Sequence, residues 1–186
     1  MKSELLKTKN FSDDEDDFFD EDEEDTLENK YLVFVCDKKL YSLEIRYVTE
    51  IVAMQPITEV PNLPPSIMGI INLRGKVLPV LDVRIRFNVA KREYDERTCI
   101  IIASMDNSSI GLIVDAVNEV EFIPESEIEP PPKMGDSINS KFVKGIGKSG
   151  EEVKIILDLK NLIHESEVPK SALNKSESEI IKQREN

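Results

Sequence analysis

The stretch IMGIINLRGKVLPVLD (residues 67–82) joins two apolar runs through a short basic turn. Apolar, β-branched runs bounded by turn residues are typical of strands. Gly75 can adopt a positive φ without a Cβ penalty, so a tight turn is expected, with Arg74 and Lys76 at its tip. The stretch therefore predicts a β-hairpin with a basic tip. An arginine there suits recognition of a carboxylate or of backbone carbonyls better than catalysis, and the alternative is a turn with solvated charges.

Short apolar runs alternate with turn residues through most of the chain between residues 30 and 164. Such closely spaced strands, with few long helical periods, indicate an antiparallel barrel or sandwich. We predict an all-β fold, and a pair of small barrels is attractive because the two halves share a similar strand and turn rhythm. Their identity is too low to establish a repeat. The other expected strands are 31–36, 40–43, 45–54 (after a possible short helical start), 98–103, 110–114, 115–122, 142–146 and 153–157, the last two joined by a turn at 147–150.

Short helical turns are expected at three places. Ser66 is expected to cap a single turn that leads into the central hairpin. Residues 82–87 suit a short turn or helix, and residues 158–163 a helical turn that closes the last hairpin. Asp82 and Asp115 each follow an apolar strand, and we expect them to cap the next turn rather than to act as paired catalytic carboxylates.

The acidic charge belongs mainly to the N-terminus, because residues 1–29 contribute −10 of the net charge of −13. We predict that this segment is a disordered acidic tail. Phe18 and Phe19 within it are either a small docking motif or part of a solubilising tail. Residues 165–186 are predicted to form a polar tail with at best a marginal helix. The part between the tails has no basic excess, which argues against nucleic acid as a partner.

No apolar run approaches the ~20 residues that cross a bilayer, and the first residues lack the apolar region of a signal peptide. We therefore expect a cytoplasmic protein without direct membrane insertion. Cys36 and Cys99 lie in strand-like runs and are expected to be buried thiols rather than a disulfide or metal ligands.

Catalytic groups are scarce in the sequence. His164 is the only histidine, and no serine or cysteine nucleophile motif accompanies it. The segment GIGKSG (residues 145–150) is superficially similar to a phosphate loop, but it lacks the Walker spacing and joins two strands. No His/Cys cluster or calcium loop is present in the sequence. We expect no catalytic residue, no metal site and no cofactor.

Four segments taken together, YLVF (31–34), YSLE (41–44) with VTEI (48–51), residues 69–82 and residues 111–120, resemble the CheW family of bacterial chemotaxis adaptors. The resemblance covers about residues 30–164. Its most specific part is NLRG (72–75) followed by PVLD (79–82). The chain departs from the family at Ala116, where many relatives have glycine, and in its long acidic N-terminal extension.

The resemblance implies two intertwined five-stranded barrels, SH3-like or OB-like, with a hydrophobic seam and no enzymatic activity. It also implies an adaptor that couples the cytoplasmic tips of methyl-accepting chemoreceptors to the regulatory domain of the histidine kinase CheA. Such an adaptor is recruited to membrane-associated receptor arrays.

Receptor contact is implied near the groove between the lobes, which would accept a receptor helix. Val48 and Cys99 would supply apolar contact, Glu50 and Arg74 would fix the register, and the glycines would permit close approach. Alternatively, Val48 and Cys99 are plain core residues, and Arg74 holds its hairpin against the neighbouring lobe. The residues implied in receptor contact are Val48, Glu50, Gly69, Arg74, Gly75 and Cys99.

Kinase contact is implied at Val117 and Gly145. Both lie where strands turn, so maintenance of the fold is an equally good explanation of their roles.

Four other interpretations compete with the chemotaxis adaptor. The same fold could serve a surface-motility pathway or a gene-regulatory phosphorelay, which the sequence does not separate from chemotaxis. A CheV-like protein would need a receiver domain, for which too few residues follow Ile163. An oligonucleotide-binding barrel is disfavoured by the negative charge and the lack of a basic and aromatic face, and an enzyme ranks last.

Overall fold

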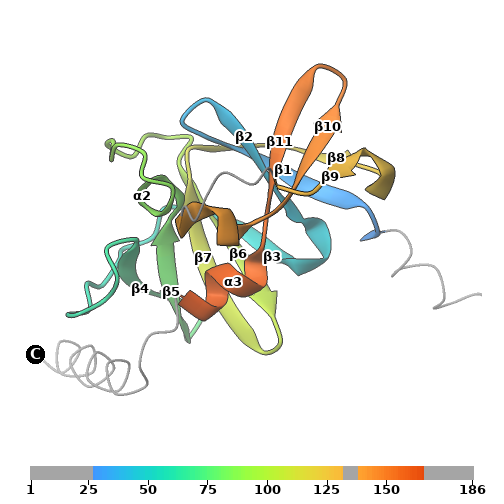
Figure 1. Ribbon diagram of the computed structural model, residues 1–186. Coiled ribbons are helices and arrows are strands. Elements are labelled where there is room, and N and C mark those ends of the chain that lie inside the picture. The colour runs from blue at the N-terminus through green and yellow to red at the C-terminus, as the bar shows by residue number, and fades with distance from the viewer. Residues whose placement is uncertain (1–26, 132–137, 166–186) are drawn as a thin grey trace, which may run out of the picture.

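The structure, a computed structural model, describes residues 27–131 and 138–165. Two β-sheets lie side by side, with short helices at their edges and α3 across the front (Figure 1). No helix within the described ranges is long and apolar enough to span a membrane. The elements, with η for 3-10 helices, are β1 (Lys30–Cys36), β2 (Lys39–Glu44), η1 (Ile45–Tyr47), β3 (Val48–Ala53), β4 (Ile67–Leu73), β5 (Lys76–Asp82), α2 (Val83–Arg86), β6 (Cys99–Met105), β7 (Ser108–Val114), β8 (Ala116–Phe122), η2 (Glu125–Glu127), β9 (Ile128–Glu129), η3 (Ile138–Phe142), β10 (Val143–Ser149), β11 (Glu152–Leu157) and α3 (Leu159–Glu165).

The strand order is β8-β1-β2-β11-β10-β9 in one sheet and β3-β6-β7-β5-β4 in the other. We call the first sheet lobe A and the second lobe B. Lobe A takes strands from both ends of the described chain, whereas lobe B is built from its middle. The predicted all-β, two-lobed fold is confirmed, except that lobe A has a sixth, two-residue strand, β9.

The two lobes repeat one pattern of strand pairing. In each lobe a hairpin pairs antiparallel with an edge strand on one side and parallel with an inner strand on the other. The hairpin β1–β2 of the N-terminal half belongs to lobe A, and the hairpin β6–β7 of the C-terminal half belongs to lobe B. The two halves have therefore exchanged hairpins, and in this sense the two lobes are intertwined.

Strand register makes the two lobes comparable residue by residue. Val80 of β5 pairs with Gly111, and Ile156 of β11 occupies the same place opposite Ser42. Residues 67–84 thus correspond to residues 143–160 without a gap. Asp82 and Asp158, for instance, both donate their backbone N–H to the carbonyl of the residue preceding the first strand of their hairpin.

Three hairpins turn through two residues that both have positive φ, which is the type I′ geometry that matches the twist of antiparallel strands. In the central hairpin these are Arg74 (φ 51°) and Gly75 (φ 87°). The sequence predicted the positive φ of Gly75 but not that of Arg74. The other two turns are Asp37–Lys38 and Asp106–Asn107.

A hydrophobic seam lies between the lobes, as the resemblance implied. It contains Phe34 and Leu43 of lobe A and Leu112 of lobe B, all at most 1 % exposed. Each fully buried side chain of this size contributes about 1.5–3 kcal/mol. Two smaller clusters fill the lobes themselves: six buried residues in lobe B but three in lobe A.

Two predicted turns were wrong. Ser66 does not cap a helical turn, because β4 begins at the next residue and the buried Ser66 hydroxyl has no hydrogen-bond partner among the described residues. Its carbonyl accepts the Asp82 N–H at 2.9 Å at the base of the central hairpin. The last hairpin turns later than expected, since Ser149 pairs with Glu152 and leaves residues 150–151 as the turn.

The two strand-end aspartates also differ from each other. Asp82 caps α2 as expected, accepting the backbone N–H groups of Arg84 and Ile85. Asp115 does not cap a turn. Its carboxylate accepts the Asp37 N–H at 2.9 Å and lies 3.2 Å from Nε of the buried Arg84, so it joins the hairpin tip of lobe A to α2.

Candidate functional site

The tip of the central hairpin is tied to β3 by one ion pair. Arg74 donates two hydrogen bonds to Glu50, at 3.0 and 2.8 Å. The Asn72 side chain accepts the Gly75 N–H at 2.8 Å and stiffens the turn. The Arg74 side chain is nevertheless 76 % exposed. Arg74 thus holds its hairpin against its own lobe, not against the neighbouring one, and still presents its guanidinium to solvent.

A row of hydroxyl groups crosses lobe B at the same end. Thr49 bonds Ser104 at 3.2 Å, Ser104 bonds Ser109 at 2.8 Å, and Lys76 donates to Ser109 at 2.8 Å. The row runs from β3 to β5, the two elements that carry Glu50 and the hairpin tip. Together with the ion pair it forms a continuous polar surface that can offer donors and acceptors to a partner.

Val48 and Cys99 lie at opposite ends of the β3–β6 pair. Val48 faces Ala103 across the ladder, whereas Cys99 faces Ala53. Both are half-buried and pack against the seam. Burial raises the pKa of the Cys99 thiol, although its sulfur accepts the backbone N–H of Val117. Cys99 therefore lies beside a residue predicted to contact the kinase, away from the other residues predicted to contact the receptor.

Two of the three predicted site glycines, Gly69 and Gly145, let neighbouring backbone segments approach closely, whereas a Cβ on Gly75 would meet no atom within 4 Å. A Cβ on Gly69 would lie 2.2 Å from the carbonyl oxygen of Thr58. A Cβ on Gly145 would lie 2.8 Å from Cγ2 of Ile128 and 3.0 Å from the carbonyl oxygen of Glu129. Neither glycine has room for a side chain, so both are needed for packing whatever else they contact.

The residues predicted for the two partners occupy matching positions in the two lobes. Gly69 and Gly145 each follow a register shift in their hairpins. Val48 and Val117 each precede a bulge in their edge strands. The family resemblance assigned the two sets to different partners, and strand register places Val48 with Val117 and Gly69 with Gly145 at equivalent positions of the repeated unit.

A groove of about 600 Å³ lies between the lobes. Its walls come from η1, the end of the β6–β7 hairpin, β10 and the start of α3. Sequence reasoning missed Tyr47, Met105 and Lys160 in its lining, although Tyr47 directly precedes Val48. A second hollow of about 310 Å³ adjoins it and includes His164. In residues 27–131 and 138–165 no group of His, Cys, Asp and Glu could hold a metal ion.

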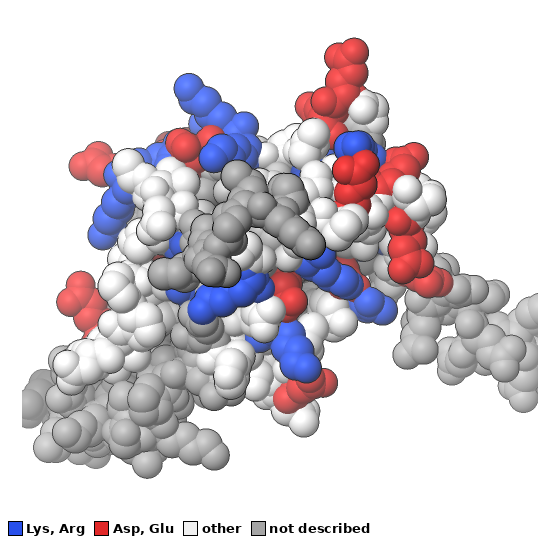
Figure 2. All heavy atoms as spheres, viewed as in Figure 1, with Lys and Arg blue, Asp and Glu red and all other residues white. Residues whose placement is uncertain are grey.

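Acidic side chains gather at the far end of lobe A, over β8, β9 and the β10–β11 hairpin (Figure 2). Basic side chains lie near α2 and the tip of the β1–β2 hairpin. The two ends of the molecule therefore differ in charge and would attract different partner surfaces.

A repeated β-unit with exposed polar surfaces and a groove between its lobes has the features of a scaffold or adaptor. Residues 30–167 match the family model described as CheW-like domain, and the chain belongs to this family.

Relatives and a solved structure agree with this assignment. The chain is 35% identical over 144 residues to "Chemotaxis protein CheW" of Bacillus subtilis, covering 77% of this chain and 92% of the relative. It is 29% identical over 144 residues to the protein of that name from Klebsiella aerogenes, covering 77% and 87%. The scaffolding protein TtCheW from Thermoanaerobacter tengcongensis superimposes with a TM-score of 0.65 at 44% identity, covering 70% of this chain and 88% of that one. The family is one of chemotaxis scaffold proteins and not of enzymes.

Proposed function

We propose that this protein couples methyl-accepting chemoreceptors to the histidine kinase CheA in membrane-associated signalling arrays, so that receptors control kinase activity. The observation that carries the proposal is the repetition of one candidate surface on two lobes that share a single core. A protein with two related surfaces held rigidly by a common seam is suited to binding two partners at once.

On lobe B, the cytoplasmic tip of a receptor would present a helix to the inter-lobe groove. Arg74 and Glu50 would fix its register through charge-assisted hydrogen bonds, and Val48 would add apolar contact at the rim. Gly75 would let the hairpin tip approach the helix, and Gly69 would hold the base of that hairpin in place.

On lobe A, the regulatory domain of CheA would contact the region of Val117 on β8. This strand ends the order of lobe A, so its outer side is open for pairing in the part of the chain that the structure describes. Gly145 would support this surface indirectly, because it lets β9 lie against β10. Cys99 would link the two regions through its contact with Val117.

A second candidate function is a CheW-like scaffold of a motility pathway or phosphorelay other than chemotaxis. It is favoured by the similarity to "Protein FrzA" of Myxococcus xanthus, at 30% identity over 110 residues, covering 59% of this chain and 69% of that protein.

The experiment is a pull-down and gel filtration with CheA and a receptor cytoplasmic fragment from the same organism, followed by assays of receptor-dependent kinase activity. A ternary complex that places phosphorylation under receptor control is the expected result. Binding to neither partner by correctly folded protein would refute the proposal and favour the second candidate.

A further inference from the structure

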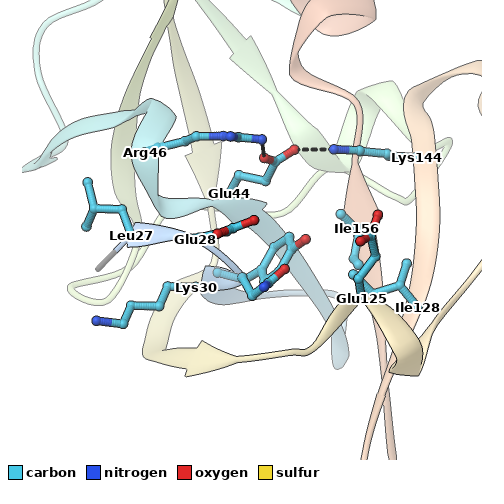
Figure 3. A pocket seen from close by; sticks show the side chains of 11 residues that line it. Leu27, Glu28, Lys30, Glu44, Arg46, Glu125, Ile128, Lys144 and Ile156 are labelled. Carbon is cyan, nitrogen blue, oxygen red and sulfur yellow. Dashed lines mark hydrogen bonds and ion pairs between the residues drawn. The ribbon is translucent and has the colours of Figure 1, made fainter. Parts of the chain in front are cut away.

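A pocket of about 200 Å³ opens on lobe A where the chain enters β1 (Figure 3). None of the residues assigned to either partner above lines it, but Glu44 and Lys144 also line the groove between the lobes, and Ile128 lies against Gly145. Its walls come from residues 27–31, from the end of β2 with η1, from η2 with β9, and from β10 and β11. A space of this volume is smaller than a typical cofactor site and suits a single side chain.

The two cations at the roof of the pocket are already neutralised. The Glu44 carboxylate, buried at 9 % exposure, accepts hydrogen bonds from Arg46 and from Lys144, the latter at 2.5 Å. Figure 3 shows this three-residue bridge. Burial is the largest single influence and lowers the pKa of Lys144, but the hydrogen bond with Glu44 and the negative charge of Glu44 together outweigh it, and the pKa is raised. Both cations are therefore held by Glu44.

The remaining polar groups of the pocket have no partner among the described residues. Tyr31 is 5 % exposed and lines the pocket, and its hydroxyl makes no hydrogen bond to that part of the chain. Glu28 and Glu125 also line it, and neither carboxylate forms an ion pair there. The two carboxylates face the space from opposite sides, whereas Lys30 extends away from it (Figure 3). The two carboxylates and the Tyr31 hydroxyl are therefore available to accept hydrogen bonds from a bound group.

Lobe B shows that the fold does not need polar groups at this place. By strand register, Tyr31, Glu44 and Lys144 of lobe A correspond to apolar residues that pack in the interior of lobe B. Ile128 and Ile156 have apolar counterparts, Ile57 and Val80. The residues that fill the equivalent space in lobe B are Ile57, Met68, Val80, Ile100 and Ile113.

The surroundings of the pocket favour a positive charge. The strand β8 and η2 carry Glu119 and Glu127 in addition to the pocket residues, and no basic residue lies between positions 116 and 129. Glu129 of β9 is paired with Lys148 at 2.6 Å and adds little to this charge. The sequence immediately before Leu27 is also strongly acidic. A negative field of this kind attracts cationic groups and repels anionic ones.

We propose that this pocket binds a lysine or arginine side chain of a partner protein, with its charged group between Glu28 and Glu125 and a hydrogen bond to the Tyr31 hydroxyl. The aliphatic part of the guest side chain would pack against Ile128 and Ile156. This goes beyond the adaptor function and depends on neither of its proposed partners.

The test is an NMR titration of the full-length protein with N-acetyl-L-arginine amide and N-acetyl-L-lysine amide, which carry the side-chain charge without backbone charges. N-acetyl-L-citrulline amide is the neutral control of nearly the same shape. We expect chemical-shift changes centred on residues 27–31 and 125–128 with a cationic probe and none with citrulline. Arginine and lysine probes compared side by side show which of the two basic side chains the pocket prefers.

Variants separate the pocket from the general acidity of the protein. Glu125→Gln and Tyr31→Phe should each weaken binding by at least about threefold, because each removes one acceptor for the guest. The matched control, Glu127→Gln, removes the same charge from the same 3-10 helix outside the pocket and should leave binding unchanged. The proposal is overturned if citrulline binds as well as arginine, if shifts are confined to residues 1–26, or if Glu127→Gln weakens binding as much as Glu125→Gln.

Discussion

Arg74 and Glu50 lie 24 residues apart in the chain and meet in a two-bond ion pair at 3.0 and 2.8 Å. The pair joins the exposed tip of the central hairpin to the edge strand β3. Because the arginine is largely exposed, its contribution to stability is small, about 0–1 kcal/mol. Folding therefore depends little on the pair, which leaves it available for the proposed contact with the receptor.

Reversing one charge should therefore separate function from stability. Arg74→Glu should leave the melting temperature within a few degrees of the native value and weaken receptor binding about tenfold or more, because two carboxylates would repel each other and lose the donor. Thermal unfolding and receptor binding measure the two effects. The swapped variant Arg74→Glu with Glu50→Arg restores the pair but not the donor at position 74. Recovery of receptor binding in the swap would show that the pair is only structural.

The turn itself permits a stabilising change at the same residue. Arg74 has a φ of 51°, a conformation that asparagine adopts more readily than arginine, and Asn-Gly is a preferred type I′ pair. Arg74→Asn should raise the free energy of unfolding by up to about 1 kcal/mol while it weakens receptor binding. Urea unfolding and the same binding assay give the two readings. If the variant is more stable and binds the receptor as well as the native protein does, Arg74 is not part of the receptor-binding surface.

Local sequence was sufficient where a structural feature depends on neighbours in the chain. The central hairpin was predictable from two apolar runs and one turn. The capping role of Asp82 was predictable from its position before a short helix. The exchange of hairpins was expected only from the family resemblance and not from local sequence, because it depends on parallel pairing of β2 with β11 and of β7 with β5. Few identities, such as Gly69 with Gly145, mark the repeat.

The candidate site was predictable only in part for the same reason. Glu50 and Arg74 were both singled out from the sequence, and they do meet. The groove residues Tyr47, Met105 and Lys160 come from three distant segments, and no local pattern marks them. The bridge of Glu44 with Arg46 and Lys144 likewise joins residues 100 positions apart.

The two equivalent glycines should differ in how much a methyl group costs. Gly69 has a φ of 142°, and a Cβ there would meet a backbone carbonyl at 2.2 Å, which cannot move aside. At Gly145 the nearest atom, at 2.8 Å, is a methyl group of Ile128 that can shift. Gly69→Ala should therefore destabilise by several kcal/mol, and Gly145→Ala by about 1–3 kcal/mol. Gly150→Ala, with no atom within 4 Å, is the control for backbone strain alone. Equal losses for Gly69→Ala and Gly150→Ala in urea unfolding would contradict the steric explanation.

Alkaline pH should weaken the seam through Tyr41. Burial raises the pKa of Tyr41 to about 12. Below pH 10 the phenol is protonated in both folded and unfolded chains, so its contribution is complete there. Between pH 10 and 12 the unfolded chain ionises first and stability falls, by about 1.4 kcal/mol at pH 11. Tyr41→Phe should lose that much less than the native protein between pH 8 and 11 in urea unfolding. Cys36, whose pKa burial raises to about 12, adds to the fall in both proteins. Parallel losses in the two proteins would rule out Tyr41 as a source.

Lys154 and Glu121 form a second polar contact that lobe B lacks. The lysine side chain is 3 % exposed, and its Nζ lies 2.8 Å from Oε2 of Glu121. By strand register these residues correspond to Leu78 and Val52, an apolar pair in the interior of lobe B.

Removing one partner of a buried ion pair leaves an uncompensated charge, whereas replacing both by apolar residues removes the desolvation cost as well. Glu121→Val should therefore destabilise the protein by about 3–5 kcal/mol, and Lys154→Leu by less because Glu121 is 21 % exposed. Glu152, 3.5 Å from the lysine, would reduce the first loss. The double variant, which gives lobe A the apolar pair of lobe B, should be within about 1 kcal/mol of the native protein or more stable. Urea unfolding of the four proteins forms a double-mutant cycle. If the losses in free energy of unfolding of the two single variants add up in the double variant, Lys154 and Glu121 are not coupled. The difference between the interiors of the two lobes would then need another explanation.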